Sequence, residues 1–494
     1  MLSRVLCLGA FVALSAVAPA VEVSPLAASS TEFARAQAGS AIRWQPWNEA
    51  ALARAKASGK SVYVFIGSPL SELTRATISQ TFASEKTVAW LNESFFCIFV
   101  DAEAQPDVAA YGQHFIRSVK QLQGAPVHLW LVPDTLQPYD GANYLPPSEE
   151  WGKPGFLKAA RAALDTWTVD PSRAKALTAE ALEMMRLPPL DLTARLDVDA
   201  KLEAAAKAWT AASDPIHGGF GSAPKLPEPE LIRFLLARDA PAREAAIKAA
   251  RALVNSALRD PVDGGFHRRC IDEAWKEPYF QKTLLDQARI ALALFEAADA
   301  AKDEKLRAAG IGALDFVLKE LKNSDGTFAA ALDGTLEENL DPTKRPKFVK
   351  VGAASAGASG LFIVALHRSG EKAHLTVATQ LASQFKDQAA AHPAMALAWR
   401  ARKEPAADKI LATANALHFD ATTGTYMATA ASLPVGFAIR VPVWGEVPAP
   451  EVLALLAGVD AKTADLIRRN LMNQIEYDEL PPGDVLLGLS QAPK

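Results

Sequence analysis

The chain has 494 residues, of which 50% are hydrophobic and 22% are charged. This length and composition are typical of a globular protein with two or three hydrophobic cores, and they exclude a single small domain. The net charge of −4 gives no general electrostatic reason to bind nucleic acid or an anionic membrane, and we expect neither partner.

The first twenty residues predict a secretory signal peptide. Arg4 precedes an apolar run over residues 5–17, and the small residues APA at 18–20 provide a cleavage site. The run is shorter than the roughly 20 residues that span a bilayer, which favours a cleaved leader over a membrane anchor. We therefore expect a secreted or periplasmic protein that is not membrane-bound after cleavage, with residues 21–42 as a linker.

Short β-type runs alternate with helical patterns between residues 43 and 170. The predicted strands cover 61–66, 95–101 and 127–132, and the predicted helices cover 48–58, 69–80, 85–92 and 107–120. Strands that alternate with helices predict an α/β domain with a parallel pair of strands.

From about residue 190 to residue 494 the pattern changes to helices only. Alanine-rich segments with apolar residues at helical spacing are separated by Gly, Pro and Asp. The predicted helices cover 197–211, 228–237, 241–258, 283–300, 303–322, 354–368, 371–388, 393–401, 406–416, 449–458 and 461–472. We therefore predict an all-α array in this half.

The connections in the helical half repeat one turn motif. DPIHGGF at 214–220 and DPVDGGF at 260–266 are near copies, and 324–328 and 420–426 are weaker ones. Each predicts a tight Asp/Gly turn followed by an aromatic residue that packs back onto the helices. One alternative is that these residues only make turns. If the helices form an α/α toroid, the same loops would surround the mouth of a central cavity.

Several stretches together carry a resemblance to a known family: WQPW (44–47), DAEAQPD (101–107), NYLPP (143–147), GGFGSAPKLP (218–227), GGFHR (264–268), PYFQK (278–282) and DQA (286–288). The chain resembles the family with an N-terminal thioredoxin-like domain of the DUF255 type and a C-terminal six-hairpin toroid. The resemblance implies a multidomain protein, with an α/β thioredoxin-like domain at 43–170 followed by an all-α (α/α) toroid at 190–494. The chain is shorter than a typical member, which points to a truncated toroid with the loss after Asp333.

A second departure concerns the reactive site. Members usually carry CxxCH in the first domain, and an ungapped alignment places Ser71 and Thr74 on the two cysteine positions and Arg75 on the histidine. Pro126 occupies the position of the family's cis-proline. A hydroxyl gains nothing comparable to a thiolate from a helix N-terminus, because its pKa lies far above the physiological range.

The corner between the first strand and its helix therefore reads as structural. We expect Ser68 as the N-cap, Pro69 at the first helical position and Glu72 near the positive end of the helix dipole. The first domain is predicted to be a degenerate, redox-inactive module that packs against the toroid or docks a partner.

The spacing of the cysteines and histidines predicts neither thiol chemistry nor a metal site. After cleavage of the leader only Cys97 and Cys270 remain, and neither has a CxxC partner or metal-ligand spacing. Residual thiol chemistry through one of them is the least favoured hypothesis. The eight histidines show no metal-binding spacing, and no phosphate-binding glycine motif occurs, so we expect no metal and no cofactor.

The toroid contains the remaining candidates for a ligand pocket. These are Lys225, His267, Arg268, Glu277, Lys282 and Asp286, with aromatic residues between them. Rings that stack on sugars, beside groups that move protons, suit a carbohydrate site. Glu277 and Asp286 are candidates for a hydrolase pair, and His267 with His217 or His418 for an epimerase. The alternative is a solvated loop with an ion-paired helix start.

Two functions remain open after these observations. The first is an exported, non-redox binding or scaffold protein of unknown ligand. The second is a carbohydrate-active enzyme, of the sugar epimerase or glycosidase type, with its site in the toroid. A carbohydrate and a protein both remain candidates for the ligand, and thiol–disulfide oxidoreductase activity is not expected.

Overall fold

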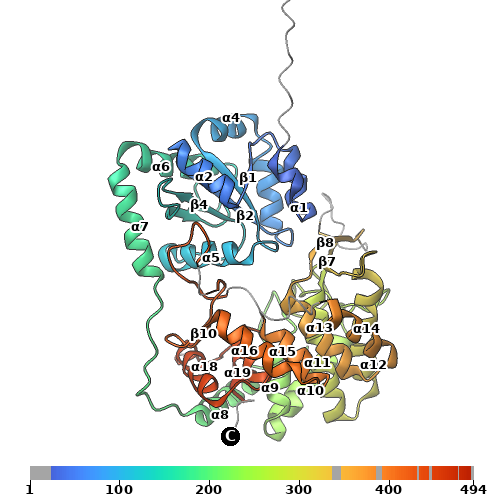
Figure 1. Cartoon of the computed structure of the whole chain (residues 1–494). Coiled ribbons are helices and arrows are strands. Elements are labelled where there is room, and N and C mark those ends of the chain that lie inside the picture. Colours follow the sequence, from blue (N-terminus) through green and yellow to red (C-terminus); the bar gives the residue numbers. More distant parts are fainter. Residues whose placement is uncertain are drawn as a thin grey trace, which may run out of the picture.

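The computed structural model describes residues 24–335, 346–384, 392–430, 433–443, 448–476 and 478–490. The predicted leader and the last residues of the predicted helix 371–388 lie outside these ranges. The described chain is mixed α/β, with a small sheet near its N-terminus followed mainly by helices, which confirms the expected order of an α/β part before a helical part (Figure 1). No helix among the described residues is long and apolar enough to cross a membrane.

The N-terminal sheet has five strands in the order β1-β3-β2-β4-β5. Their bounds are β1 Gln45–Pro46, β2 Val62–Gly67, β3 Phe96–Asp101, β4 Val127–Leu131 and β5 Pro138–Ala142. Strands β1, β3 and β2 are parallel to one another. Strand β4 runs antiparallel to β2, and β5 runs antiparallel to β4. The three predicted strands and their parallel pair are therefore present.

Strand β2 is buried on both faces because its side chains alternate between two cores. Tyr63 and Phe65 join an aromatic cluster on one face, whereas Val62, Val64 and Ile66 join an aliphatic cluster on the other. Residues 24–42, predicted as a linker, add Leu26, Ala34 and Ile42 to the aromatic cluster. The helices around the sheet are α1 Glu32–Ala36, α2 Glu49–Ser58, α3 Glu72–Ala76, α4 Glu85–Ser94, α5 Pro106–Lys120, α6 Phe156–Val169 and α7 Pro171–Met185.

In the second half, six of the described helices contact one another in a closed ring. In ring order they are α9 Pro229–Leu236, α11 Leu284–Ala301, α13 Ala356–Ser369, α15 Pro393–Ala401, α17 Pro450–Leu456 and α19 Gly483–Ser490, and α19 returns to α9. Each of these helices also packs against an outer helix. The outer helices are α8 Val198–Ala211, α10 Ala240–Val254, α12 Glu304–Phe316, α14 Lys372–Gln384, α16 Ala406–His418 and α18 Ala461–Gln474.

Glycines let the inner helices approach closely where the ring closes. A Cβ at Gly483 of α19 would lie 2.5 Å from the backbone nitrogen of Leu231 in α9. A Cβ at Gly360 of α13 would lie 2.8 Å from the carbonyl carbon of Ala394 in α15. Larger residues at these two positions would force the helix pairs apart. The ring closes although the sequence predicts a loss of chain after Asp333.

The prediction of helices only in the second half is wrong in one region. Strands β6 Gln281–Thr283, β7 Ala329–Asp333 and β8 Val349–Ala353 form an antiparallel sheet in the order β6-β7-β8. Two further short strands, β9 Phe419–Asp420 and β10 Thr425–Tyr426, pair with each other. These strands are only two to five residues long, which is too short for a clear alternation of apolar and polar residues in the sequence.

The two halves touch through a second segment besides the β6-β7-β8 sheet. Phe437 packs edge-on against Tyr111 of α5 and Trp47, at ring-centroid distances of 4.8 Å and 6.2 Å. A Cβ at Gly436 would lie 2.6 Å from the Trp47 indole, and Gly436 has a positive φ of 93°. In Figure 1 this segment reaches from the helical half towards α5. Glycine is therefore required where the segment passes over the indole.

Candidate functional site

The corner between β2 and α3 is built around Ser71. Ser71 is the N-cap of α3: its Oγ accepts a hydrogen bond from the Thr74 backbone at 3.2 Å. The same hydroxyl donates to the carbonyl of Ala125 at 3.2 Å, next to the cis Ala125–Pro126 peptide. The hydroxyl at the first cysteine position is thus engaged as both donor and acceptor.

The expected N-cap at Ser68 is wrong by three residues. A turn closed by the Ser71 backbone N–H and the Ser68 carbonyl, 3.1 Å apart, precedes the helix, so Pro69 lies in this turn. Thr74, at the second cysteine position, is fully buried, and its Oγ1 accepts from the Ser68 backbone at 3.3 Å. Glu72 does lie in the first turn of the helix, as expected.

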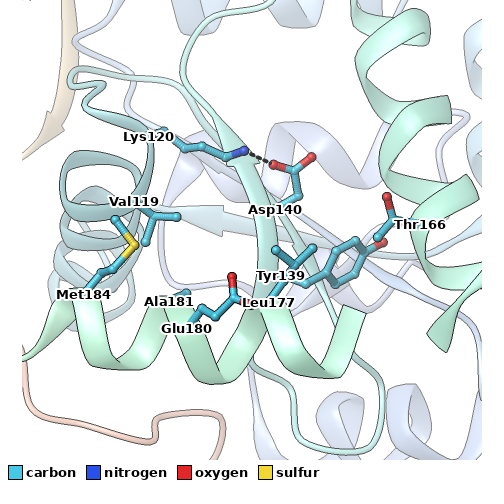
Figure 2. Close-up of a pocket in the computed structure, with 9 residues that line it drawn as sticks. All are labelled: Val119, Lys120, Tyr139, Asp140, Thr166, Leu177, Glu180, Ala181 and Met184. Atoms are coloured by element: carbon cyan, nitrogen blue, oxygen red, sulfur yellow. Dashed lines mark ion pairs between the residues drawn. The ribbon is translucent and has the colours of Figure 1, made fainter. Parts of the chain in front are cut away.

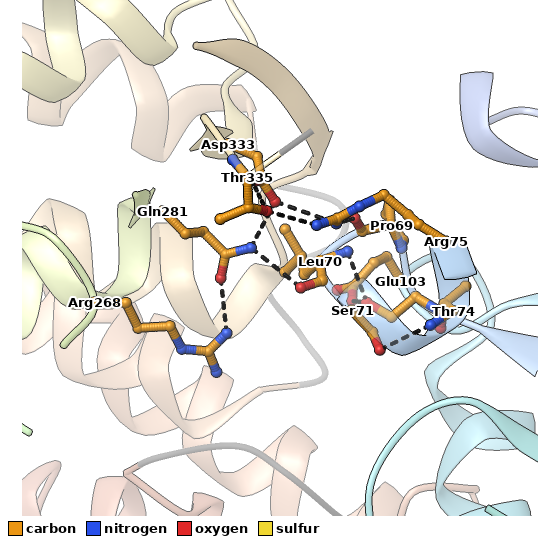
Figure 3. A network of polar contacts seen from close by, with 11 residues as sticks. Pro69, Leu70, Ser71, Thr74, Arg75, Glu103, Arg268, Gln281, Asp333 and Thr335 are labelled. Carbon is orange, nitrogen blue, oxygen red and sulfur yellow. Dashed lines mark hydrogen bonds and ion pairs between the residues drawn. The ribbon is translucent and has the colours of Figure 1, made fainter. Parts of the chain in front are cut away.

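Arg75, at the position of the family's histidine, reaches the helical half. Its guanidinium pairs with Asp333 at the end of β7, 3.2 Å away, and donates to Thr335 Oγ1 at 2.6 Å (Figure 3). It also donates to the Pro69 carbonyl at 2.9 Å, which ties the corner to itself. The Asp333 side chain is fully buried, so Arg75 supplies its counter-charge.

Gln281 at the start of β6 extends this contact. Its Nε2 donates to Asp333 Oδ2 at 2.8 Å and to the Leu70 carbonyl at 3.1 Å. Tyr279 hydrogen-bonds to Glu72 of α3, and burial raises the pKa of this tyrosine to about 12. Four side chains of the helical half, those of Asp333, Thr335, Gln281 and Tyr279, therefore hold the corner.

Two carboxyl groups lie at the carboxyl end of β3, beside the corner. Asp101 accepts from Thr31 Oγ1 at 2.5 Å, and Glu103 accepts from Ser68 Oγ at 2.8 Å. Burial raises the pKa of both groups. Arg268, a predicted pocket residue, exerts an attraction on Glu103 and donates to Gln281 Oε1 at 2.9 Å. The structure therefore brings Arg268 to the same interface as Ser71.

Neither cysteine can supply a thiolate at neutral pH. Cys97 and Cys270 are both free and buried, and burial raises the pKa of each thiol to about 12. The thiolate is the reactive form, so both thiols are inert in the folded chain. The hypothesis of residual thiol chemistry therefore has no structural support.

The two predicted lysines lie in structural ion pairs. Lys225 is fully buried, pairs with Asp214 of the first turn motif, and donates to the Glu273 carbonyl at 3.1 Å. Lys282 is fully buried between Asp260 and Asp263 of the second motif, at 2.6 Å and 2.7 Å. Each lysine thus anchors a turn onto the protein interior, and its ammonium group faces carboxylates of this chain.

The predicted histidines do not gather in one place. His267 is buried against Phe280, and its Nε2 lies 4.0 Å from Asp260. His217 faces Asp214 at 3.4 Å, and His418 lies 3.0 Å from the Met427 carbonyl. These three histidines therefore belong to three separate turn regions. Glu277 is exposed on the loop before β6, whereas Asp286 is buried in the first turn of α11, so the two carboxylates lie in different environments.

Asp286 belongs to a charged cluster at the N-terminal ends of the inner helices. Its carboxylate accepts from Thr283 Oγ1 at 2.7 Å and pairs with Arg289 at 3.2 Å. Arg289 also makes a two-pronged contact with Glu230 of α9, at 2.8 Å and 2.5 Å. Desolvation alone would lower the pKa of Arg289, but Glu230 raises it, so the arginine stays charged.

Two further carboxyl groups border this cluster, and the sequence-based candidates include neither. Burial raises the pKa of Glu228, before α9, and of Asp484, in α19; the charge of Glu230 raises both further. Glu228 also has a positive φ of 46°, which is uncommon outside glycine. The available sequence signal was an acidic residue next to a proline at the start of a helix. Helix dipoles favour acidic residues at the start of any helix, so this signal does not single out Glu228 or Asp484.

A separate cavity of about 180 Å³ lies between α5, β5, α6 and α7 (Figure 2). At its rim Lys120 pairs with Asp140 at 2.6 Å, while the Tyr139 hydroxyl donates to the Ala163 carbonyl. Its polar groups thus satisfy one another, and the volume is below the roughly 300 Å³ at which ligand pockets begin. Among the described residues no group of His, Cys, Asp or Glu has the arrangement of a metal site.

A match to a protein family covers the N-terminal part of the chain. The family described as "Protein of unknown function, DUF255" matches residues 24–186. Spermatogenesis-associated protein 20 of Mus musculus is 28% identical over 67% of this chain and 44% of its own length. The Homo sapiens protein of that name is 27% identical over 63% of this chain and 41% of its own. The chain therefore spans less than half the length of these relatives.

Solved structures resemble this chain only distantly. A sugar epimerase from a ruminal bacterium aligns with 60% of this chain and 99% of its own, at 13% identity and a TM-score of 0.45. Residues 24–186, which contain the corner and the five-stranded sheet, therefore match the DUF255 family.

Proposed function

We propose that the protein is an exported, non-redox binding protein in which a degenerate thioredoxin-like domain is fixed against an α/α toroid of six helical hairpins. The observation that carries this proposal is that the corner after β2 makes contacts both within its own domain and with the helical half. Ser71 caps its helix and bonds to Ala125, while Arg75 pairs with a buried carboxylate of the other half. The two cysteine positions are thus occupied by residues that stabilise the corner itself, and the histidine position is occupied by an arginine that joins the corner to the other half.

Physical chemistry supports a structural corner over a catalytic one. A serine nucleophile requires an adjacent base, and the hydrogen-bond partners of Ser71 Oγ are a backbone N–H and a carbonyl oxygen. Thr74 is inaccessible. A fixed corner leaves the relative position of the two halves set in advance, which lowers the entropic cost of binding a ligand that touches both.

Export rests on the leader pattern at residues 1–20. Two inert, buried thiols suit an oxidising compartment, because neither cysteine is available to form an unwanted disulfide. Both a carbohydrate and a protein remain candidates as the ligand.

A screen of the mature chain by thermal shift tests the binding role. A ligand that binds only the folded state raises the melting temperature, with about 2.7 kcal/mol of stabilisation at a hundredfold excess over its Kd. We expect a shift with a member of a saccharide panel or with a protein co-purified from the exported fraction. An insulin-reduction assay on the same sample should show no activity, and measurable reduction would contradict the non-redox assignment.

The Asp286–Arg289–Glu230 cluster favours a second candidate, a carbohydrate-active enzyme in the toroid. Asp286 and Glu230 both pair with Arg289, while burial raises the pKa values of Glu228 and Asp484. Carboxyl groups whose environments separate their pKa values are suited to act as general base and general acid. The partner of Asp286 would then be one of these groups and not the exposed Glu277.

Turnover assays with variants separate this candidate from a binding role. Release or epimerisation of a sugar by the mature chain, lost in Glu228→Gln but kept in Glu277→Gln, would support the enzyme. A saccharide that shifts the melting temperature without any turnover would support the binding protein.

A further inference from the structure

The two near-identical turn motifs differ at one functional position. In the second motif, Asp260 and Asp263 both bind the buried Lys282. In the first motif, Asp214 alone binds the buried Lys225, and His217 stands where the second motif has Asp263. The Glu273 carbonyl supplies the remaining contact to Lys225. The first lysine is therefore satisfied without a second carboxylate, and the histidine is released from that role.

His217 faces outward from the turn. Its side chain is 38% exposed, and its Nδ1 lies 3.4 Å from Asp214 Oδ2. A carboxylate beside Nδ1 fixes the orientation of the ring and leaves Nε2 for another partner. Among the described residues none forms a hydrogen bond with this Nε2.

A surface pocket of about 450 Å³ lies beside this histidine. Its lining residues are His217, Ala252, Asn255, Ser256, Ala257, Ala274, Trp275 and Lys276. The lining contains an ammonium group, an imidazole and a carboxamide but no carboxylate, and the nearby Asp214 is neutralised by Lys225. Its volume lies within the range of about 300–1,000 Å³ that is typical of small-molecule sites.

The Trp275 side chain is only 2% exposed and packs behind the pocket, where contacts with the first turn motif fix its position. Its indole N–H donates to the Gly218 carbonyl at 3.1 Å, and the Lys225 ammonium lies 5.3 Å from the ring centroid. A Cβ at Gly219 would come within 2.8 Å of the indole, so the glycine is needed for this packing. Trp275 also has a positive φ of 61°, a conformation that costs energy in a bulky residue and is often associated with binding sites.

We propose that this pocket binds a small organic anion, namely a carboxylic acid of about the size of a sugar acid. Lys276 and the Asn255 carboxamide would donate to the carboxylate, and His217 Nε2 would contact a hydroxyl. The Lys276 ammonium favours an anion over a cation as ligand, and the methyl groups of Ala252, Ala257 and Ala274 provide an apolar surface for the carbon skeleton. The site depends on neither the corner at Ser71 nor the cluster around Arg289.

Isothermal titration of the mature chain with sodium glucuronate tests the proposal, with glucose as the neutral counterpart. We expect glucuronate to bind with a Kd on the order of 1 mM or tighter, and glucose to bind at least about tenfold more weakly. His217→Asp recreates the second motif and should fold normally, yet weaken glucuronate binding at least about tenfold, as should Lys276→Gln. Lys207→Gln removes an exposed charge on α8, outside the pocket, and should change nothing.

Equal binding of glucose and glucuronate would overturn the proposal, and so would the absence of glucuronate binding. If both His217→Asp and Lys276→Gln keep full affinity for glucuronate, with unchanged melting temperatures, the anion binds elsewhere on the protein and the proposal is wrong. Because thermal-shift hits at the corner or the ring are unaffected by His217→Asp, failure here is distinguishable from failure of the proposed binding role.

Discussion

Arg75 and Asp333 form an ion pair 3.2 Å long that joins the corner after β2 to the end of β7 in the helical half. The Asp333 side chain has no exposure to solvent, whereas that of Arg75 is 20% exposed. An arginine at the position of the family's histidine thus serves as a counter-ion for a buried carboxylate. The relationship explains how the corner has a role without thiols.

Replacement of Arg75 by Ala should destabilise the folded chain by roughly 3 kcal/mol, because it leaves Asp333 buried without its cation. Urea unfolding measures the loss. The matched control is Arg173→Ala, which breaks an exposed pair with Glu180 and should cost less than about 1 kcal/mol. The double variant Arg75→Ala/Asp333→Asn should recover part of the stability, and an equal loss in Arg75→Ala and Arg173→Ala would argue against a buried pair.

Ser71→Ala should lower the free energy of unfolding by about 1 kcal/mol, since it removes the N-cap of α3. Ser84 offers a control within the same domain, because it precedes α4 without making a side-chain cap hydrogen bond. Ser84→Ala should therefore be nearly neutral. Similar losses in the two variants, measured by thermal unfolding, would be inconsistent with the capping role of Ser71.

Because both thiols are buried, we predict that they do not react in the folded chain and that the folded chain loses stability at alkaline pH. Cys97 and Cys270 should not react with a thiol reagent at pH 8 in the folded chain but should react fully in denaturant. Burial raises the pKa of both thiols from 9.0 to about 12, so the folded state prefers the protonated form. This contribution to stability is complete below pH 9 and is lost as the pH rises from 9 towards 12.

Cys97→Ala/Cys270→Ala should therefore flatten the alkaline part of the stability–pH curve relative to the unsubstituted chain. Rapid labelling of either thiol at pH 8 in the folded protein would show that the residue is accessible and would reopen thiol chemistry.

The two buried lysines should differ in how much their removal costs. Lys282→Ala leaves Asp260 and Asp263 facing each other without a cation, whereas Lys225→Ala leaves only Asp214. We expect Lys282→Ala to lose roughly 4 kcal/mol or more, and Lys225→Ala about 3 kcal/mol. Chemical denaturation of the two variants measures the order, and a smaller loss for Lys282→Ala would contradict the contacts described here.

The sequence predicted the parts of the fold that have strong local patterns. The runs at 61–66, 95–101 and 127–132 are rich in β-branched and aromatic residues, and the strands occur within one residue of these bounds. Strands β1 and β5 escaped because they are short or contain proline and glycine. The N-cap was assigned to Ser68 because Pro69 is typical of a first helical position, yet the chain makes an extra turn first.

The site was harder to predict because its charges find partners far away in sequence. Lys225 and Lys282 were candidates for a ligand pocket, but only the fold shows that Asp214 and Asp260 neutralise them. Glu230 and Arg289 lie on different helices, 59 residues apart. Arg268 was a candidate for the toroid pocket, and the structure places it beside the corner of the other half, next to Gln281 and Glu103.

Differential scanning calorimetry of the mature chain tests the central claim, that the corner fixes the two halves to each other, most directly. We predict a single cooperative unfolding transition for the unsubstituted chain, because the halves share the Arg75–Asp333 pair and the Gln281 contacts. Arg75→Ala/Gln281→Ala should split it into two transitions. Two independent transitions in the unsubstituted chain, at temperatures that the double variant leaves unchanged, would contradict the account.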